Sequence, residues 1–370
     1  MRLSFRASTL TLTLALSLIS ICALAQVTGG VRQMEFLRLP NSPHISALGG
    51  IAVASQDDDI SFALQNPALM RPGLHNQLGL NYNNFYAGIS TANLNYGYHV
   101  PKINTSFALG IQYLNYGTFK ATDPVGHIYG DVRAADYAIS LGAARQYKEK
   151  WRYGATLKFA HSQLADKSAS ALLADVGVVR YDTASLWMFG IVAKNMGFSL
   201  RNYTKGNQEP LPFDLQLGIS KQMRNIPLRL MMNVHHLYEW DIRYDNPADQ
   251  PTGLIATPDS NAKEKSHFGD KLFRHFNFAA ELTFFKRVTA SVGYSHLRRS
   301  ELALTEKKAT AGFSFGASVD LNKFKVYYAR SYYHIAGAYN EFGLALQLNQ
   351  LTGIGSLTEK WHWRAEYPNW

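Results

Sequence analysis

Cysteine is nearly absent from this sequence. Among its 370 residues only Cys22 is a cysteine, and it lies in an apolar stretch near the N-terminus. If that stretch is removed on export, the remaining chain has no thiol. Disulfide bonds, thiolate catalysis and cysteine-ligated metal sites are then excluded together. We therefore expect a chain that is stabilised by burial and hydrogen bonding alone.

The first 25 residues have the features of a secretory signal peptide. Two arginines precede an apolar stretch from Leu10 to Leu24, and Ala23-Leu24-Ala25 offers the small-x-small pattern of a cleavage site. We predict that residues 1–25 are removed. The alternative is a lipoprotein signal ending at Cys22, which Ile21 disfavours because a small residue is wanted directly before a lipidated cysteine.

Long apolar runs are also lacking. Beyond the signal, no apolar run reaches the ~18 residues that a membrane-spanning helix needs. Yet hydrophobic residues make up 46% of the chain and aromatic residues 13%, while the mean hydropathy is only −0.17. This combination is typical of strands that turn alternate residues toward lipid. A soluble β-sandwich or propeller is the alternative, so the periodicity has to decide.

Period-two alternation recurs from about residue 76 onward. In the segment 90–100, Leu94 and Tyr96 fall on one face, and Asn93 and Asn95 fall on the other. About fourteen such segments occur, each of roughly the ten residues that a tilted strand needs to cross a bilayer. Their predicted spans are 76–86, 90–100, 104–115, 132–145, 151–163, 169–181, 185–196, 213–222, 226–239, 272–285, 287–299, 308–317, 323–330 and 337–349. We therefore predict an all-β fold, a transmembrane antiparallel β-barrel of about 14 strands over residues 76–349, with a C-terminal tail over 350–370.

The connections and the charges favour a membrane barrel. From the second strand on, short connections alternate with long ones such as 116–131, 197–212 and 240–271. Membrane barrels show this alternation because tight turns face the periplasm and long loops face outward. Gly and Ala are abundant on the inferred inner face, which leaves space for a plug. Four charged residues also fall on that face, away from lipid: Lys158, Asp175, Arg229 and Glu281.

The segment 26–75, between the signal and the first predicted strand, has a different character. It contains, in order, Phe36-Leu37-Arg38-Leu39-Pro40, Ala47-Leu48-Gly49-Gly50, Asp57-Asp58-Asp59 and Asn66-Pro67-Ala68. This ordered set resembles the PorV/PorQ branch of FadL-like outer-membrane proteins, and within it the PorQ-like components of type IX secretion. The resemblance implies a FadL-like barrel in which residues 26–75 fold into the lumen as an N-terminal hatch.

The hatch residues also have roles that physical chemistry predicts. Gly49-Gly50 permits a backbone turn with positive φ. Asp57-Asp58-Asp59 can cap backbone N–H groups at a turn or a helix start. In Asn66-Pro67, the proline fixes the direction of the chain. Calcium binding by the three aspartates is the alternative, although an oxygen cage needs more ligands than this run directs inward.

Catalytic motifs are lacking as well. No Walker loop, HExxH, GxSxG or dinucleotide fingerprint occurs. Among the 12 histidines, His235 and His236 are adjacent in a predicted strand, so they should point to opposite faces and cannot share a metal without a bulge. His161-Ser162 lies near a strand end without an identifiable third residue. We therefore predict that the protein is not an enzyme and has no metal site and no cofactor.

The resemblance implies a function in the cell outer membrane. It predicts an accessory component of type IX protein secretion that anchors surface machinery, which attaches cargo proteins to the cell surface. The implied partners are a PorZ-like surface protein and other components of that system, beside outer-membrane lipid and lipopolysaccharide. Export leaves no role for nucleic acid, despite the formal net charge of +10. The candidate docking loop is 240–271, with Trp240, Asp241, Tyr244, Asp245, Lys263, Lys265 and Lys271.

Other classes of function stay open. The main alternative is a FadL-like outer-membrane transporter of hydrophobic small molecules, which requires an apolar pocket near the hatch. A lipid hydrolase would require a Ser/His pair on adjacent strands facing lipid. The loop 240–271 is rich in Asp, Asn, Pro and Lys, so simple solvation is the alternative to docking there.

Overall fold

The computed structural model describes residues 32–55, 57–123, 125–204, 206, 209–242, 268–302, 310–334 and 337–352. The predicted signal peptide, most of the loop 240–271 and most of the tail 350–370 lie outside these residues. Among the described helices, none is long and apolar enough to cross a membrane.

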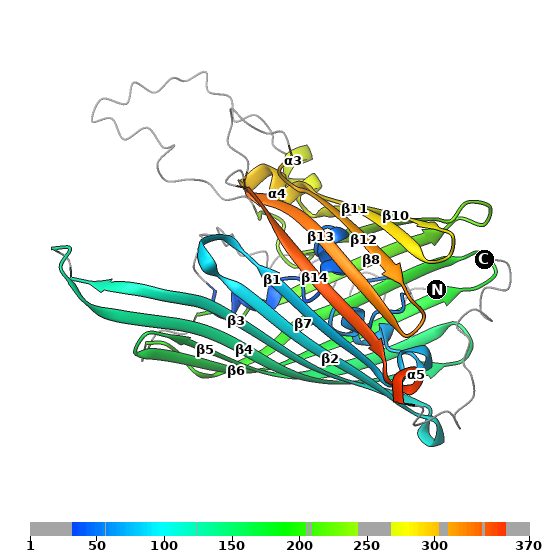
Figure 1. Ribbon diagram of the computed structural model, residues 1–370, viewed down its shortest axis with the longest axis horizontal. Helices are drawn as coiled ribbons and strands as arrows, with labels where there is room; N and C mark the ends of the chain where they lie inside the picture. The colour runs from blue at the N-terminus through cyan, green and yellow to red at the C-terminus, as the bar shows by residue number, and fades with distance from the viewer. Residues whose placement is uncertain are drawn as a thin grey trace, which may run out of the picture.

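The chain forms one closed antiparallel β-barrel of 14 strands (Figure 1). Each strand pairs with its neighbours in sequence, and β1 pairs with β14 to close the ring. The strands are β1 (Gln77–Asn84), β2 (Ser90–Val100), β3 (Thr105–Thr122), β4 (Ile128–Tyr147), β5 (Trp151–Leu164), β6 (Lys167–Asp182), β7 (Trp187–Arg201), β8 (Asp214–Gln222), β9 (Leu228–Val234), β10 (Phe276–Phe284), β11 (Val288–Ser295), β12 (Phe313–Asp320), β13 (Phe324–His334) and β14 (Gly337–Gln347). The predicted fold class and strand number are confirmed.

Side-chain alternation in the barrel is that of a membrane protein. On β2, Asn93 and Asn95 point inward and are 6% and 1% exposed, whereas Tyr98 points outward and is 47% exposed. Large apolar side chains such as Leu141 and Leu157 likewise cover the outer surface, at 59% and 55% exposed. A soluble sandwich would bury these side chains, so that alternative is wrong, and the barrel is an outer-membrane barrel. The four charges predicted to point inward line the lumen, where they pair with other polar groups.

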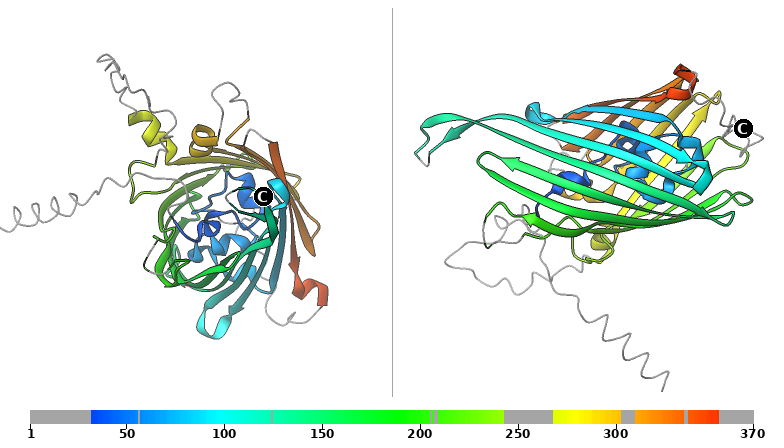
Figure 2. Two further views of the ribbon diagram at one scale, coloured as in Figure 1. Left: turned by 90° about the vertical axis from the view of Figure 1, so that its left-hand side faces the viewer. Right: turned by 90° about the horizontal axis from the view of Figure 1, so that it is seen from below.

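The wall of the barrel is uneven. The strands β3 and β4 have 18 and 20 residues, whereas β9 has 7. Pairing of β3 with β2 ends at Asn115, and pairing of β4 with β5 begins at Ala134. Residues 119–122 and 128–132 therefore pair only with each other. We call them, with the turn between them, the β3–β4 ribbon; it projects well past the neighbouring strands (Figures 1 and 2).

Two expectations about the connections are wrong. The stretch 116–131 is mostly strand rather than loop. In sequence it resembles a loop because its polar and apolar residues are mixed and show no regular alternation. The connection between β5 and β6 is only two residues, Ala165 and Asp166, although it lies at the end where long loops were expected. The other long connections, after β7 and β9, are found at that same end. We take this end as the cell surface and the end with the β8–β9 and β12–β13 turns as the periplasm.

The segment before β1 lies inside the barrel (Figure 2). It forms the short helices η1 (Glu35–Arg38), α2 (Pro43–Ala47), η2 (Ile60–Leu64), η3 (Pro67–Leu69) and η4 (Pro72–Leu74). Its apolar side chains form the core of the molecule, with Ile45, Leu48 and Phe62 at 0%, 0% and 1% exposed. We call the described residues 32–75 the hatch.

The remaining helices lie between or after strands. They are η5 (Tyr86–Gly88), η6 (Pro101–Ile103), α3 (Phe268–Arg274), α4 (His296–Leu302) and α5 (Leu348–Thr352). The helices α3 and α4 follow β9 and β11 at the surface end, and α4 closes part of the lumen there.

Candidate functional site

The glycine pair of the hatch makes a turn against the wall. Gly49 and Gly50 have φ of +83° and +93°, which L side chains rarely adopt. Asn277 of β10 donates its side-chain N–H to the carbonyl of Gly49 at 3.0 Å. A Cβ added to Gly49 would collide with that same amide. Glycine is therefore required here both by backbone conformation and by close approach.

The Asn-Pro pair starts a helical turn beside β6. Asn66 Oδ1 accepts a hydrogen bond from Ala68 N at 3.0 Å, and Asn66 Nδ2 donates to the carbonyl of Val53 at 2.9 Å. Pro67 is the first residue of η3, where a missing N–H has no cost. Gly177 of β6 leaves the room for Asn66, because a Cβ there would collide with its side chain. The small inner-face residues thus fit the hatch.

Each of the three aspartates 57–59 makes a different contact. Asp59 caps η2, because its Oδ1 accepts a hydrogen bond from Ser61 N at 2.9 Å. Asp58 forms an ion pair with Arg71 of the hatch. Asp57 faces the barrel wall and takes its partners there.

His44, Asp57 and Glu281 form a buried cluster between hatch and wall, which we call the lower cluster. His44 Nε2 lies 2.6 Å from Glu281 Oε1. Arg229 lies 3.1 Å from Glu281 and 3.3 Å from Asp57, and Lys325 lies 3.5 Å from Asp57. Burial alone would lower the pKa of His44, but the two carboxylates outweigh it and raise that pKa to about 10. Cations of the chain itself therefore lie within ion-pair distance of both carboxylates of this cluster.

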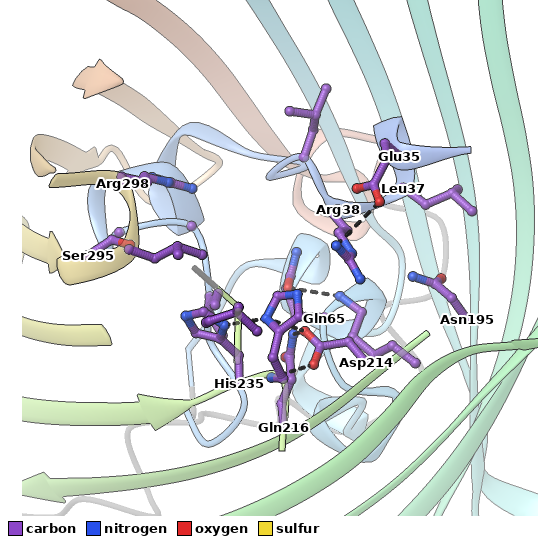
Figure 3. Close-up of a pocket in the computed structure, with 18 of the residues that line it drawn as sticks. Glu35, Leu37, Arg38, Gln65, Asn195, Asp214, Gln216, His235, Ser295 and Arg298 are labelled. Atoms are coloured by element: carbon purple, nitrogen blue, oxygen red, sulfur yellow. Dashed lines mark hydrogen bonds and ion pairs between the residues drawn. The ribbon is translucent and has the colours of Figure 1, made fainter. Parts of the chain in front are cut away.

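Toward the cell surface the lumen holds a cavity of about 410 Å³ (Figure 3). Its floor and one side come from the hatch, and the rest comes from β7, β8, the residues after β9, and α4. Leucine and isoleucine side chains contribute apolar patches, including Leu37, Leu39 and Ile51. Charged side chains are interspersed among them: Arg32, Glu35, Arg38, Lys194, Asp214, Glu239, Arg298 and Glu301.

Four of these charges form two ion pairs within the cavity. Arg32 lies 2.6 Å from Glu239. Arg38 lies 3.3 Å from Glu35. Lys194 donates to Oε1 of the neutral Gln65 of the hatch at 3.1 Å. The cavity therefore combines paired charges with a substantial apolar lining.

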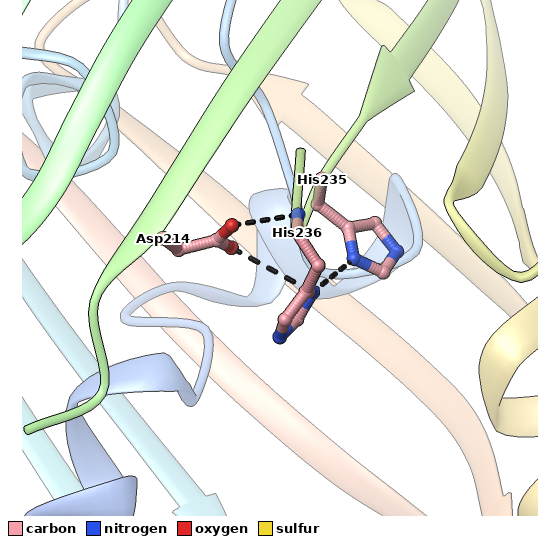
Figure 4. A group of neighbouring side chains, drawn as sticks. All are labelled: Asp214, His235 and His236. Atoms are coloured by element: carbon pink, nitrogen blue, oxygen red, sulfur yellow. Dashed lines mark hydrogen bonds and ion pairs between the residues drawn. The ribbon is translucent and has the colours of Figure 1, made fainter. Parts of the chain in front are cut away.

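Three side chains at the cavity wall form a second cluster, which we call the upper cluster: Asp214, His235 and His236 (Figure 4). The two Nδ1 atoms of His235 and His236 lie 2.5 Å apart, and His236 Nδ1 lies 3.9 Å from Asp214 Oδ2. One ligand atom of each residue lies within 4.8 Å of the other two. The expectation that the two histidines point to opposite faces is wrong. The strand β9 ends at Val234, and His236 turns back with a φ of +56°.

The described part of the candidate docking loop is its two ends. Trp240 is 48% exposed and packs on Phe268 at 5.4 Å between ring centroids. Asp241 forms an ion pair with Lys271 of α3 at 2.5 Å. These contacts bring the two ends of the loop together at the surface. The other candidate residues, Tyr244, Asp245, Lys263 and Lys265, lie outside the described residues.

His161 and Ser162 do not form a catalytic pair. Ser162 points inward, donates to Asp136 and accepts from the hydroxyl of Tyr203. His161 points outward, and its Nδ1 lies 2.8 Å from the hydroxyl of Ser170 on β6. This is a Ser/His pair on adjacent strands of the outer face; the ring of Tyr137 packs against the imidazole, and among the described residues His161 has no hydrogen bond to a carboxylate. A triad needs a polar group to orient the imidazole, so the pair is read as a cross-strand hydrogen bond.

Fold and lumen together define a class: a closed, fourteen-stranded outer-membrane barrel with a hatch that fills its lumen. No protein-family model matches the chain, and no curated protein matches it in sequence. Among solved structures, it is similar to the toluene transporter TodX of Pseudomonas putida, with a TM-score of 0.50 and 10% identity over 83% of this chain and 97% of that one.

Two further solved structures are similar at lower scores. The monoaromatic hydrocarbon channel CymD has a TM-score of 0.49 and 14% identity over 84% of this chain and 97% of that one. A FadL homologue of Pseudomonas aeruginosa has a TM-score of 0.44 and 11% identity over 83% and 98%. At such identities the likeness concerns the fold, which is that of FadL-like barrels, as the sequence predicted.

Proposed function

We propose that this protein is a plugged outer-membrane barrel that holds a protein partner at the cell surface, as an accessory component of type IX secretion. The observation that carries the proposal is the β3–β4 ribbon. It exposes four large apolar side chains, Phe119, Val125, Ile128 and Tyr129, at 45%, 80%, 64% and 75%, beside exposed charged residues such as Lys120 and Asp131.

The ribbon has the properties of a binding surface for protein. It extends past the residues that pair β3 with β2, so lipid does not cover it. A two-stranded ribbon is only marginally stable alone, and both its edges offer unpaired N–H and C=O groups to another chain. Contiguous exposed apolar side chains next to such edges favour a protein partner.

The lumen supports a role at the surface rather than conduction. The hatch is tied to the wall by the buried ion pairs of the lower cluster. Above it, two ion pairs, Arg32–Glu239 and Arg38–Glu35, lie among the apolar side chains that line the cavity. The order of motifs in the hatch further supports the type IX assignment, with a PorZ-like protein as partner and no catalysis by the barrel. The loop 240–271, whose ends meet at Asp241 and Lys271, would lie on the same side.

A second candidate is a channel for hydrophobic small molecules. It is supported by the likeness in fold to the toluene transporter TodX. The comparisons favour this candidate and offer nothing for type IX secretion. The two candidates differ in what should accompany the purified barrel: a protein in the first case, and a small apolar molecule in the second.

Affinity purification of the tagged protein from native outer membranes, followed by mass spectrometry, tests the proposal. A variant with Val125, Ile128 and Tyr129 each changed to Ser removes the apolar surface of the ribbon. The matched control is Phe285→Ser, because Phe285 is 93% exposed but lies in the β10–β11 turn at the periplasmic end.

We expect one exported surface protein to co-purify with the wild type and with the control, and to be lost from the triple variant. Recovery of the barrel alone, with toluene-like or fatty-acid-like molecules bound, would overturn the proposal in favour of the channel. An uptake assay with such molecules in a deletion strain then decides whether the second candidate holds.

A further inference from the structure

We propose that Asp214, His235 and His236 bind a first-row divalent transition metal, such as Zn²⁺, in the surface-facing mouth of the barrel. The inference concerns the upper cluster alone and does not depend on the proposed function. Two imidazole nitrogens and a carboxylate are a ligand set that Zn²⁺ takes in proteins.

The ligand atoms are close to the geometry that such a metal needs. With bonds of about 2.0–2.1 Å in a tetrahedral site, neighbouring ligand atoms lie roughly 3.3–3.4 Å apart. The distance between the two Nδ1 atoms is 2.5 Å and the distance from His236 Nδ1 to Asp214 Oδ2 is 3.9 Å. The third pair of ligand atoms, those of His235 and Asp214, lies within 4.8 Å. We expect a bound metal to draw the three ligand atoms to these distances.

The carboxylate is already oriented for binding. Asp214 Oδ1 accepts a hydrogen bond from the backbone N–H of His236 at 2.7 Å, and Oδ2 accepts from Gln216 Nε2 at 2.7 Å. His275 supports the other side of the site, where its Nδ1 lies 2.8 Å from the carbonyl oxygen of His235. Such outer contacts hold metal ligands in place and are a regular part of metal sites.

The backbone conformation of His236 supports a functional role for this arrangement. Its φ of +56° is uncommon for a residue with a side chain, and it is what brings the second imidazole back into the lumen. With ordinary strand geometry His236 would face lipid, and the two Nδ1 atoms would not meet. Strained conformations of this kind concentrate at functional sites.

The surroundings accept a cation. Arg32 and Arg38, whose charges act on His236, are paired with Glu239 and Glu35, and this compensates their positive charge; Arg298 of α4 also faces the cavity. The cavity of about 410 Å³ borders all three ligands and gives the metal room for water or for a carboxylate of a bound partner as a fourth ligand. A site with three protein ligands and an open position suits either use.

Metal titration of the full-length protein, purified in detergent and stripped with a chelator, tests the inference. Zn²⁺ content after dialysis gives the stoichiometry, and the visible absorption of added Co²⁺ reports a site with nitrogen and oxygen ligands. The variants are His236→Ala and Asp214→Asn; the second keeps an acceptor for the His236 N–H. His99→Ala is the control, because His99 bonds Ser106 at the periplasmic end.

We expect one equivalent of metal in the wild type and in the control, and at least tenfold weaker binding in both variants. Heat-modified gel mobility identifies variants that do not fold, and Asp214→Asn serves if His236→Ala fails. Absence of binding to the folded wild type overturns the inference. Binding that persists unchanged in a folded variant also overturns it, because the metal then lies elsewhere.

Discussion

The lumen contains two histidine–carboxylate clusters of similar composition but different surroundings. The lower cluster combines His44 with two carboxylates, and the side chains of His44 and Glu281 are 2% and 3% exposed. The upper cluster combines His235 and His236 with one carboxylate and borders the cavity. In the lower cluster Arg229 and Lys325 occupy the positions around the carboxylates that a metal would need.

The difference shows how the surroundings decide what a histidine–carboxylate cluster does. Where the chain supplies its own cations, the carboxylates are satisfied and the cluster joins hatch and wall. Around the upper cluster, Arg32 and Arg38 are paired with Glu239 and Glu35 and the adjoining cavity leaves space, so the same residue types form a ligand set with an open position. The lower cluster thus has a structural role. We expect other molecules to bind in the upper half of the lumen and at the surface.

The largest effect should come from breaking the lower cluster. Glu281→Ala leaves the buried His44 without its nearest carboxylate, which should cost about 3–5 kcal/mol of unfolding free energy. The matched control is Lys120→Ala, which removes an exposed ion pair with Asp131 and should cost about 0–1 kcal/mol. Denaturant unfolding in detergent measures both. Equal losses would show that the lower cluster does not hold the hatch.

The pH dependence of stability sharpens the same point. The pKa of His44 is raised from 6.5 to about 10, so its contribution is full below pH 6.5 and is lost as the pH rises through 10. His44→Gln should therefore be less stable than the wild type at pH 6, by about 1.5–3 kcal/mol. That difference should shrink toward pH 11, as unfolding midpoints across this range would reveal. A difference that stays constant with pH would mean that folding does not raise the pKa of His44.

A smaller effect is expected at the upper cluster, which an added metal should complete. Free Zn²⁺ at ten times its dissociation constant should stabilise the wild type by about 1.4 kcal/mol. Asp214→Asn should lose this gain while it keeps most of its stability without metal. Thermal unfolding with and without Zn²⁺ measures the gain, and an equal gain in the variant would contradict the assignment of the ligands.

The smallest effect on stability is expected at the β3–β4 ribbon. Changing Ile128 and Tyr129 to Ser removes side chains that are 64% and 75% exposed, so unfolding free energy should change by no more than about 0.5 kcal/mol each. The same denaturant measurement checks this expectation. A large loss would indicate that the ribbon packs within the protein rather than awaiting a partner.

Much of the barrel was predictable because its signal is local. The alternation in β2 assigns Asn93 to the lumen and Leu94 to lipid without any knowledge of distant residues. The sequence of the ribbon predicts a loop because neither face of its strands is consistently apolar. Its β-prone residues, such as Phe119, were the available signal.

The contacts of the site depend on residues far apart in sequence. Asp57 and Lys325 are 268 positions apart, so the acidic run did not indicate which cations pair with it. The upper cluster depends on the position where β9 ends and on one residue with positive φ, His236. Neither follows from alternation, which placed the two histidines on opposite faces.

The contrast between the two clusters can be tested in a single measurement. Crystals of the wild type grown with Zn²⁺ would be measured at the zinc absorption edge, and the anomalous difference map compared at both clusters. We predict one peak about 2.0–2.1 Å from the Nδ1 atoms of His235 and His236, and none at His44. A peak at the lower cluster, or none at the upper one, would contradict the account.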